Sequence, residues 1–181
     1  MNKEILVEVT NTVTYDIYKE FFLFSSFRGK SYKRKILIFY VILFVGMSAS
    51  LYTGIIFGYD FISIVLSIIL IIAGILISYL VILAPKVYYK SAKSLVENLT
   101  IYRFTSEYLD VELKAELTNG KSEIAYNSFY KIYETDSYLY LYISISQAHI
   151  VPKKDIPINV MEQLRTIFKS TLGKSYYNYC K

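Results

Sequence analysis

Two uninterrupted apolar runs, residues 36–57 and 61–84, dominate the pattern of hydrophobic and polar positions along the chain. Neither run contains a charged residue, and only Gly58, Tyr59 and Asp60 separate them. A helix of this length is roughly 33–36 Å long, enough to cross a hydrocarbon core of about 30 Å. Because every backbone polar group must find a partner inside the structure when it lies in lipid, the pattern predicts a transmembrane helical hairpin.

Small residues recur at helical spacing in both runs. They are Gly46, Ser50, Gly54 and Gly58 in the first run and Ser63, Ser67, Gly74 and Ser78 in the second. Small side chains let helix backbones approach closely, which is a main source of helix association in lipid. The two stripes therefore predict helix packing, either between the two spans of one hairpin or between two copies in a homodimer. A polar pore is disfavoured because no ionisable residue lies in either run.

The segment before the hairpin has two different periods. Residues 5–10 are mostly β-branched or aliphatic and predict a short strand. From Thr14 onward Ile17, Phe21 and Phe24 share one helical stripe, with charged residues elsewhere, which predicts an amphipathic helix. This helix either lies in the plane of the membrane interface or packs on a soluble domain.

After the hairpin, Pro85 is expected to end the second span, and residues 85–98 to form a helical connector. The period then changes to two, which predicts strands at 99–104, 108–113, 122–126, 129–134, 138–144 and 147–151. Asn119-Gly120 predicts a type I′ hairpin turn, because both central residues of that turn need a positive φ. A second turn is expected at residues 135–137.

A final amphipathic helix is predicted by the apolar stripe Val160, Met161, Leu164, Ile167, Phe168 and Leu172. Asp155 or Ile156 is expected to cap it, with Pro157 in its first turn and Gly173 after its end. An antiparallel sheet capped by one C-terminal helix is typical of pleckstrin-homology-like (PH-like) domains. The fold class is therefore an α+β membrane protein with a two-helix hairpin and a PH-like domain.

Alternation is clearest at residues 138–143, where Tyr138, Tyr140 and Tyr142 share one face of the strand and aliphatic residues the other. The tyrosine face is expected to pack under the C-terminal helix or against the N-terminal segment. If it were exposed instead, it would form a partner surface or an interfacial belt.

The net charge of +5 lies at the edges of the apolar runs. The basic residues there are Arg28, Lys30, Lys33, Arg34 and Lys35 before the runs, and Lys86, Lys90 and Lys93 after them, whereas residues 94–181 carry ten basic and ten acidic residues. Cations flanking a span are retained in the cytoplasm, so both termini are expected there and residues 58–60 outside. Binding to nucleic acid is not expected, because no basic stripe exists away from these edges.

The sequence contains few candidates for catalytic or metal-binding residues. His149 is the only histidine and Cys180 the only cysteine, in a terminal tail expected to be frayed. Glu134 and Asp136 flank a turn, where a surface glutamate and a turn-capping aspartate explain them. Phosphate-binding loops and hydrolase or metalloprotease motifs are missing. We therefore expect no enzyme activity, no cofactor and no metal.

One cluster does suggest binding. Gln147, Lys153 and Lys154 precede the final helix, whose N-terminal N–H groups and positive dipole end favour an anion. They are candidate contacts for an anionic lipid or a protein partner. The alternative is a plain loop with solvated lysines.

Three segments carry a family resemblance: Lys131-Ile-Tyr-Glu-Thr135, Tyr138-Leu-Tyr-Leu-Tyr-Ile-Ser144 and Gln147-Ala-His-Ile-Val-Pro-Lys-Lys154. They resemble the signature of the YcxB-like family, small bacterial membrane proteins with two central spans and a soluble C-terminal domain. The resemblance implies a multi-pass protein of the bacterial inner membrane and brings no enzyme activity with it. The expected domains are 1–35, the hairpin 36–84, the connector 85–98 and the cytoplasmic domain 99–181.

Two functions fit these features. The first is a non-catalytic, membrane-tethered adaptor or regulator whose cytoplasmic domain binds a protein or an anionic lipid. The second is self-protection, or immunity, against a membrane-active peptide or toxin, a common task of small two-span proteins.

Overall fold

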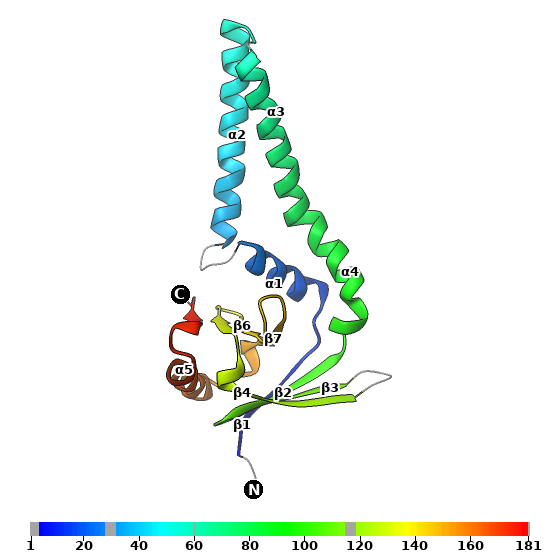
Figure 1. The fold of residues 1–181 in the computed structure, drawn as a ribbon, viewed down its shortest axis with the longest axis vertical. Coiled ribbons are helices and arrows are strands. Elements are labelled where there is room, and N and C mark those ends of the chain that lie inside the picture. Colours follow the sequence, from blue (N-terminus) through cyan, green and yellow to red (C-terminus); the bar gives the residue numbers. More distant parts are fainter. Residues whose placement is uncertain (1–3, 28–31, 60, 115–118, 181) are drawn as a thin grey trace. The chain divides into compact units, whose positions relative to one another are not determined.

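The computed structural model describes residues 4–27, 32–59, 61–114 and 119–180. The chain divides into two compact units: a sheet unit formed by residues 1–17 and 92–181, and a helical unit formed by residues 18–91. Figure 1 shows both units as ribbons. Arg28, Lys30 and Asp60, which entered the predictions of charge and topology, lie outside the described residues.

The helical unit is a hairpin of two long helices, preceded by α1 (Tyr15–Phe27), which begins in the sheet unit. The first arm is α2 (Tyr32–Phe57), and the second runs through α3 (Phe61–Ser78), a π-helical turn (Tyr79–Leu83) and α4 (Ala84–Val96) (Figure 1). Both arms are long and apolar enough to cross a membrane, as predicted. Most of their large apolar side chains are exposed, from Leu37 to Leu83.

Pro85 does not interrupt the second helix, which continues through it to Val96, so the predicted connector is helical from residue 86 to residue 96. A proline inside an α-helix loses one hydrogen bond and clashes with the carbonyl four residues earlier. Here the wider π-helical turn lies immediately before it, and the N–H of Ala84 donates to the carbonyl of Tyr79, five residues back. We attribute the continuity of the helix to this local widening.

The small residues of the two arms meet within the hairpin. The hydroxyls of Ser50 and Ser67 are hydrogen-bonded at 2.5 Å, and Tyr40 and Ser78 make a second polar contact at 3.3 Å. A Cβ placed on Gly46 would lie 3.2 Å from the Leu70 side chain. The stripe predicted from the sequence therefore includes residues at which α2 and α3 contact each other.

The glycines at the end of α2 have separate roles. A Cβ on Gly54 would lie 2.2 Å from the ring of Tyr59, which folds back over it. Gly58 has a φ of +79°, and a Cβ added there would meet no described neighbour within 4 Å. Gly58 thus provides the backbone conformation in which the chain leaves α2. Its place in the stripe had suggested a role in helix packing instead.

The first sheet joins the N-terminus to the C-terminal part of the chain. It contains β1 (Ile5–Asn11), β2 (Leu99–Thr105), β3 (Tyr108–Lys114) and β4 (Asn119–Ala125), in the order β1-β2-β3-β4 with antiparallel pairing throughout. The predicted N-terminal strand is confirmed, and it pairs with β2.

The predicted turn at Asn119-Gly120 is wrong. Asn119 pairs with Lys114 and Gly120 with Leu113, so both belong to β4, and Gly120 has no positive φ. Residues 115–118, which connect β3 and β4, lie outside the described residues. Because both residues pair with β3, the Asn-Gly pair does not form the turn that its sequence favours.

The second sheet has the order β7-β6-β5-β8. Its strands are β5 (Lys131–Glu134), β6 (Tyr138–Tyr142), β7 (Ala148–Pro152) and β8 (Tyr176–Asn178). The predicted turn at 135–137 is confirmed by the Thr135 N–H donating to the carbonyl of Tyr138. β8 was not predicted, and it pairs parallel to β5, so the structure contains two sheets and one parallel pair where a single antiparallel sheet was expected.

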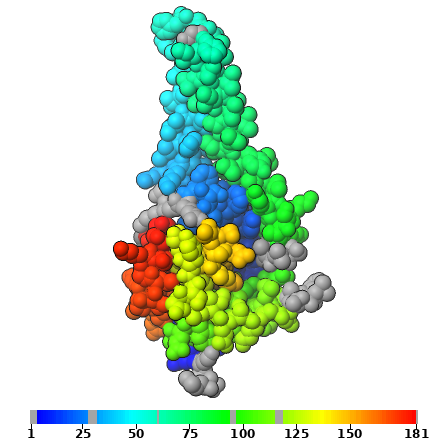
Figure 2. All heavy atoms as spheres, in the orientation of Figure 1, coloured from blue at the N-terminus to red at the C-terminus, as the bar shows by residue number. Residues whose placement is uncertain are grey.

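The core lies between the two sheets and α5 (Ile158–Leu172). The predicted stripe of α5 supplies four buried residues, Val160, Met161, Leu164 and Phe168, and packs against residues such as Leu139 and Leu141. In the space-filling view, α5 and the C-terminal segment lie beside the strands of the second sheet (Figure 2).

The start of α5 differs from the prediction. Pro157 takes the N-cap position, and Lys153–Asp155 form a separate 3-10 turn closed by the Ile156 N–H and the Lys153 carbonyl. Asp155 therefore does not cap the helix. Gly173 follows the helix with a φ of +52°, as its predicted place at the end requires.

Candidate functional site

A buried glutamate lies at the centre of the sheet unit's polar contacts. Glu134 is the last residue of β5, and two-residue alternation places it on the same face as Ile132, toward α5. Its exposed fraction is 0%. The expectation that Glu134 is a surface residue beside a turn is therefore wrong.

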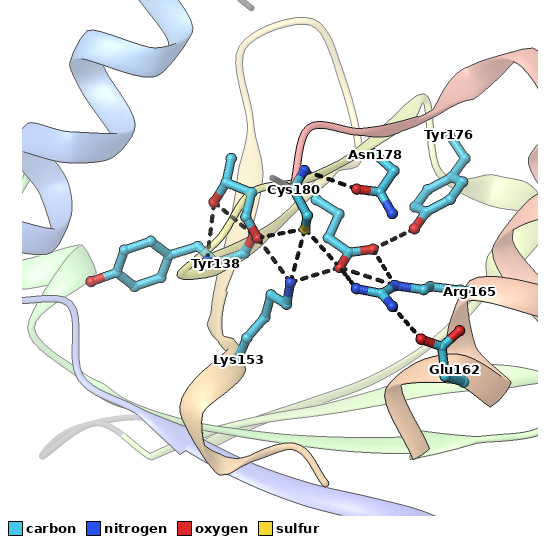
Figure 3. A network of polar contacts seen from close by, with 9 residues as sticks. Tyr138, Lys153, Glu162, Arg165, Tyr176, Asn178 and Cys180 are labelled. Carbon is cyan, nitrogen blue, oxygen red and sulfur yellow. Dashed lines mark hydrogen bonds and ion pairs between the residues drawn. The ribbon is translucent and has the colours of Figure 1, made fainter. Parts of the chain in front are cut away.

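Four side chains converge on this carboxylate (Figure 3). The Arg165 Nε lies 3.1 Å from both carboxylate oxygens, and the Lys153 Nζ lies 2.6 Å from Oε1. The Tyr176 hydroxyl donates to Oε2, and the Cys180 Sγ lies 3.1 Å from Oε1. The donors come from α5, the 3-10 turn before it, β8 and the chain's C-terminal segment, so one side chain ties four elements together.

The charge at this centre is set by competition between burial and hydrogen bonding. Burial alone would raise the pKa of Glu134, but hydrogen bonds from Arg165, Lys153, Tyr176 and Cys180 outweigh burial and lower the pKa to about 2. The hydrogen bond to Glu134 raises the pKa of Arg165. Burial, and after it the hydrogen bond to Glu134, raises the pKa of Tyr176. Glu134 is thus ionised and Arg165 is charged at neutral pH.

A pocket of about 820 Å³ lies beside this centre, within the sheet unit. Lys153, Lys154 and Arg165 supply cations to its wall, and Asp136 is an acid there. The remaining lining is mixed: polar side chains of Thr10, Asn11, Thr12, Thr14, Ser137 and Tyr138, and apolar side chains of Ile17, Pro152, Ile156, Ile158 and Met161. Such a pocket can hold an anionic group together with an apolar portion of a ligand.

The structure does not bring the three predicted contact residues together. Gln147 is exposed in the turn that precedes β7, where its carbonyl accepts the N–H groups of Ile143 and Ser144. Lys153 and Lys154 follow the other end of β7, a strand of five residues. The two lysines line the pocket and Gln147 does not.

The two lysines also differ from each other. The Lys153 Nζ has three acceptors: Glu134 Oε1 at 2.6 Å, the Thr135 carbonyl at 2.9 Å and Cys180 Sγ at 3.1 Å. Lys154 is exposed and makes no hydrogen bond or ion pair with a described residue. Lys154 is therefore the cation in this pair that a ligand can recruit without breaking an internal contact.

The C-terminal segment is ordered into the sheet unit, contrary to the expected frayed tail. The Tyr179 N–H donates to the carbonyl of Glu134 at 2.8 Å, and the Cys180 N–H donates to the Asn178 side chain at 2.9 Å. Burial and the hydrogen bond to Glu134 raise the pKa of the Cys180 thiol. The thiol is thus a structural donor here, with little nucleophilic character.

The C-terminal segment covers part of the tyrosine face. Leu139 and Leu141, on the other face of β6, belong to the core that contains α5. Tyr142 instead packs against Tyr133, with ring centroids 5.5 Å apart, and Tyr133 stacks on Tyr177 and Tyr179 at 4.9 and 5.9 Å. The C-terminal segment therefore contributes to this face, which the C-terminal helix was expected to cover.

His149 has a structural environment. Its ring lies edge-on to Tyr102 at 5.6 Å, and burial lowers its pKa, so the imidazole is neutral at pH 7. Among the described residues, no three His, Cys, Asp or Glu side chains gather where they could hold a metal ion.

Sequence reasoning missed the central role of Glu134, although a signal was present. Within β5 the alternation Ile132, Tyr133, Glu134 places the acid on the aliphatic face, where an isolated charge is costly. An acid at such a position requires cationic partners. Lys153 was already singled out, but nothing local in the sequence connects Arg165, 31 positions away, with this strand.

Comparison with known proteins gives one match. No curated protein and no solved structure matches the chain. The family model described as YcxB-like protein matches residues 112–168, a segment that contains Glu134, Lys153 and Arg165. Residues 112–168 of this chain are therefore YcxB-like, as the signature in the sequence predicted.

Proposed function

We propose that this chain is a multi-pass protein of a bacterial inner membrane with both termini in the cytoplasm. Three features support the proposal: two helices of sufficient length, large apolar side chains exposed along both, and cations at their ends. A soluble protein rarely exposes so large an apolar surface, because contact with water is unfavourable. In a bilayer the same side chains contact the hydrocarbon chains of lipids, which are also apolar.

The sheet unit serves as a PH-like binding module with a non-catalytic adaptor or regulator role. Two sheets and a C-terminal helix enclosing one core agree with that fold. The fold alone does not specify a ligand, so the proposal depends on the pocket.

The observation that carries the proposal is the pocket of about 820 Å³ with Lys153, Lys154 and Arg165 on its wall. Its cations favour a phosphate or carboxylate, and its apolar side chains favour a ligand with an acyl or aliphatic portion. An anionic lipid at the membrane surface combines both features. An acidic segment of a protein partner is the alternative ligand, and the experiment below separates the two.

Native mass spectrometry of the detergent-purified full-length chain tests the proposal. Phosphatidylglycerol and phosphatidylcholine with identical acyl chains are compared for the wild type, Lys154→Glu and the matched control Lys169→Glu. Lys169 lies exposed in the last turn of α5 and outside the pocket lining, so both variants change the net charge equally. The expected result is a preference for phosphatidylglycerol that Lys154→Glu reduces and Lys169→Glu retains.

Equal binding of the two lipids by all three proteins would overturn the lipid proposal. In-cell crosslinking of the full-length chain then tests the alternative. One dominant crosslinked protein that is lost in Lys154→Glu and kept in Lys169→Glu would make the ligand a protein, and loss of neither would remove the pocket from the function.

A further inference from the structure

The C-terminal tail, defined as residues 176–180, occupies the free edge of β5 as an added strand. Its backbone pairs parallel to β5, with Tyr176 opposite Ile132 and Asn178 opposite Glu134. A strand of three residues forms few backbone hydrogen bonds, so side chains supply much of its attachment. Tyr176 is buried in the core of the sheet unit, whereas Asn178 is exposed and Tyr177, Tyr179 and Cys180 are half-buried. The segment is visible at the surface in the space-filling view (Figure 2).

Side chains hold the tail on both faces of the sheet. On one face Tyr177 stacks on Tyr133 at 4.9 Å, and the Lys131 ammonium lies 5.8 Å from the Tyr177 ring centre. On the other face the Tyr176 hydroxyl and the Cys180 thiol donate to Glu134 (Figure 3). The edge of β5 thus recognises an extended segment with aromatic rings on one side and hydrogen-bond donors on the other.

Two cationic side chains that line the pocket also contact the carboxylate that holds the tail. Lys153 and Arg165 both line the pocket and both bind Glu134, the carboxylate that holds the tail. The Lys153 ammonium also contacts the Cys180 thiol directly, at 3.1 Å. An anion that enters the pocket therefore competes with Glu134 for the same donors.

We propose that the edge of β5 is a strand-docking site for the chain's own C-terminal tail, and that an anion bound in the pocket releases the tail. This inference rests on the anion-binding pocket of the proposed function. When Lys153 or Arg165 turns toward the ligand, Glu134 loses the cations that make its burial tolerable. The carboxylate must then be hydrated. Water reaches it through the volume that Tyr176 and Cys180 fill, so these two side chains have to move away.

The coupling is reciprocal. If an anion weakens tail docking by some factor, then loss of the tail strengthens anion binding by the same factor. Release also uncovers the edge of β5 and the Tyr133 ring, so a membrane-proximal ligand would expose a new surface for strand pairing.

Alkylation of Cys180 measures docking directly, because it is the only cysteine in the chain. The full-length protein is reconstituted in phosphatidylcholine vesicles and treated with an uncharged alkylating reagent. Three conditions are compared: no addition, inorganic phosphate, and vesicles that contain phosphatidylglycerol. The rate in denaturant gives the value for a fully released thiol.

We expect slow alkylation without an anion and an increase of roughly tenfold with one, within the usual range for coupled sites. A response to phosphatidylglycerol alone identifies a lipid headgroup, whereas a response to inorganic phosphate identifies a free anion. Tyr176→Phe, which removes one donor to Glu134 and keeps the ring, is expected to speed alkylation without any anion.

The experiments distinguish failure of tail release or docking from failure of the proposed function. Phosphatidylglycerol binding in the native mass spectra with an unchanged alkylation rate would overturn the release and leave the proposed function intact. Absence of binding in those spectra removes the proposed function and this inference with it. Alkylation as fast as in denaturant before any addition, or no acceleration by Tyr176→Phe, would overturn the docking of the tail.

Discussion

The Arg165 guanidinium places its Nε 3.1 Å from each carboxylate oxygen of Glu134, a residue that is completely buried. Planar guanidinium groups suit such two-oxygen contacts, so the arrangement fixes α5 against the end of β5. Lys153 adds a second cation at 2.6 Å. The register between the sheet and its helix therefore depends on one acid.

Replacement of Glu134 should destabilise the sheet unit. Glu134→Gln keeps the shape of the side chain but leaves two cations without their carboxylate, for which a loss of roughly 3–5 kcal/mol is usual. Hydrogen exchange of β5 and β6 in the full-length chain measures the loss locally. Glu162→Gln is the control, because Glu162 also binds Arg165 but is 62% exposed, and its loss should cost less than about 1 kcal/mol. Equal protection in both variants would contradict the central role of Glu134.

Acid should weaken the sheet unit over a defined range. The pKa of Glu134 falls from 4.5 in a free side chain to about 2 in the folded state. A lowered pKa contributes stability that is fully present above pH 4.5 and is lost as the pH falls toward 2, roughly 3 kcal/mol in all. Hydrogen exchange or thermal melting between pH 6 and pH 2.5 shows this loss, and Glu134→Gln should show a smaller change over the same range.

The small-residue contact can be tested by oxidation. Ser50→Cys with Ser67→Cys, in a Cys180→Ser background, should form a disulfide within one chain, because the two hydroxyls lie 2.5 Å apart in the hairpin. Non-reducing gels of the membrane fraction distinguish the outcomes. A monomer with altered mobility agrees with packing inside the hairpin, whereas a crosslinked dimer would assign the stripe to a homodimer interface.

Gly173 should tolerate a side chain poorly. Its φ of +52° lies in the region that L-residues avoid, so Gly173→Ala should destabilise the end of α5 by about 1–2 kcal/mol. Gly120→Ala is the matched control, because Gly120 has no positive φ and a Cβ there would lie 3.9 Å from its nearest neighbour. Melting of the two variants side by side tests the difference, and a more stable Gly173→Ala would refute it.

Membrane orientation is open to a reporter experiment. A periplasm-active enzyme fused at Tyr59 should be active, and the same enzyme fused at the C-terminus should be silent, because cations that flank a span are generally retained in the cytoplasm. The opposite pair of activities would reverse the topology.

The sequence determined the parts of this structure that depend on local pattern. The two apolar runs became α2 and α3, the alternating segments became strands, and the stripe from Val160 to Leu172 became the buried face of α5. The motif around Glu134 also identified the YcxB-like segment. These inferences succeed because periods of 2 and 3.6 residues follow from backbone geometry alone.

Tertiary structure decided what local pattern cannot specify. The predicted turn at residues 119–120 and the predicted frayed tail were both wrong, because each depends on a neighbour: the register of β4 and the edge of β5. The candidate site shows the same division. Lys153 was recognisable as a cation beside a helix, but its pairing with Glu134 and Arg165 brings together residues up to 31 positions apart, and only packing of α5 on β5 makes that contact.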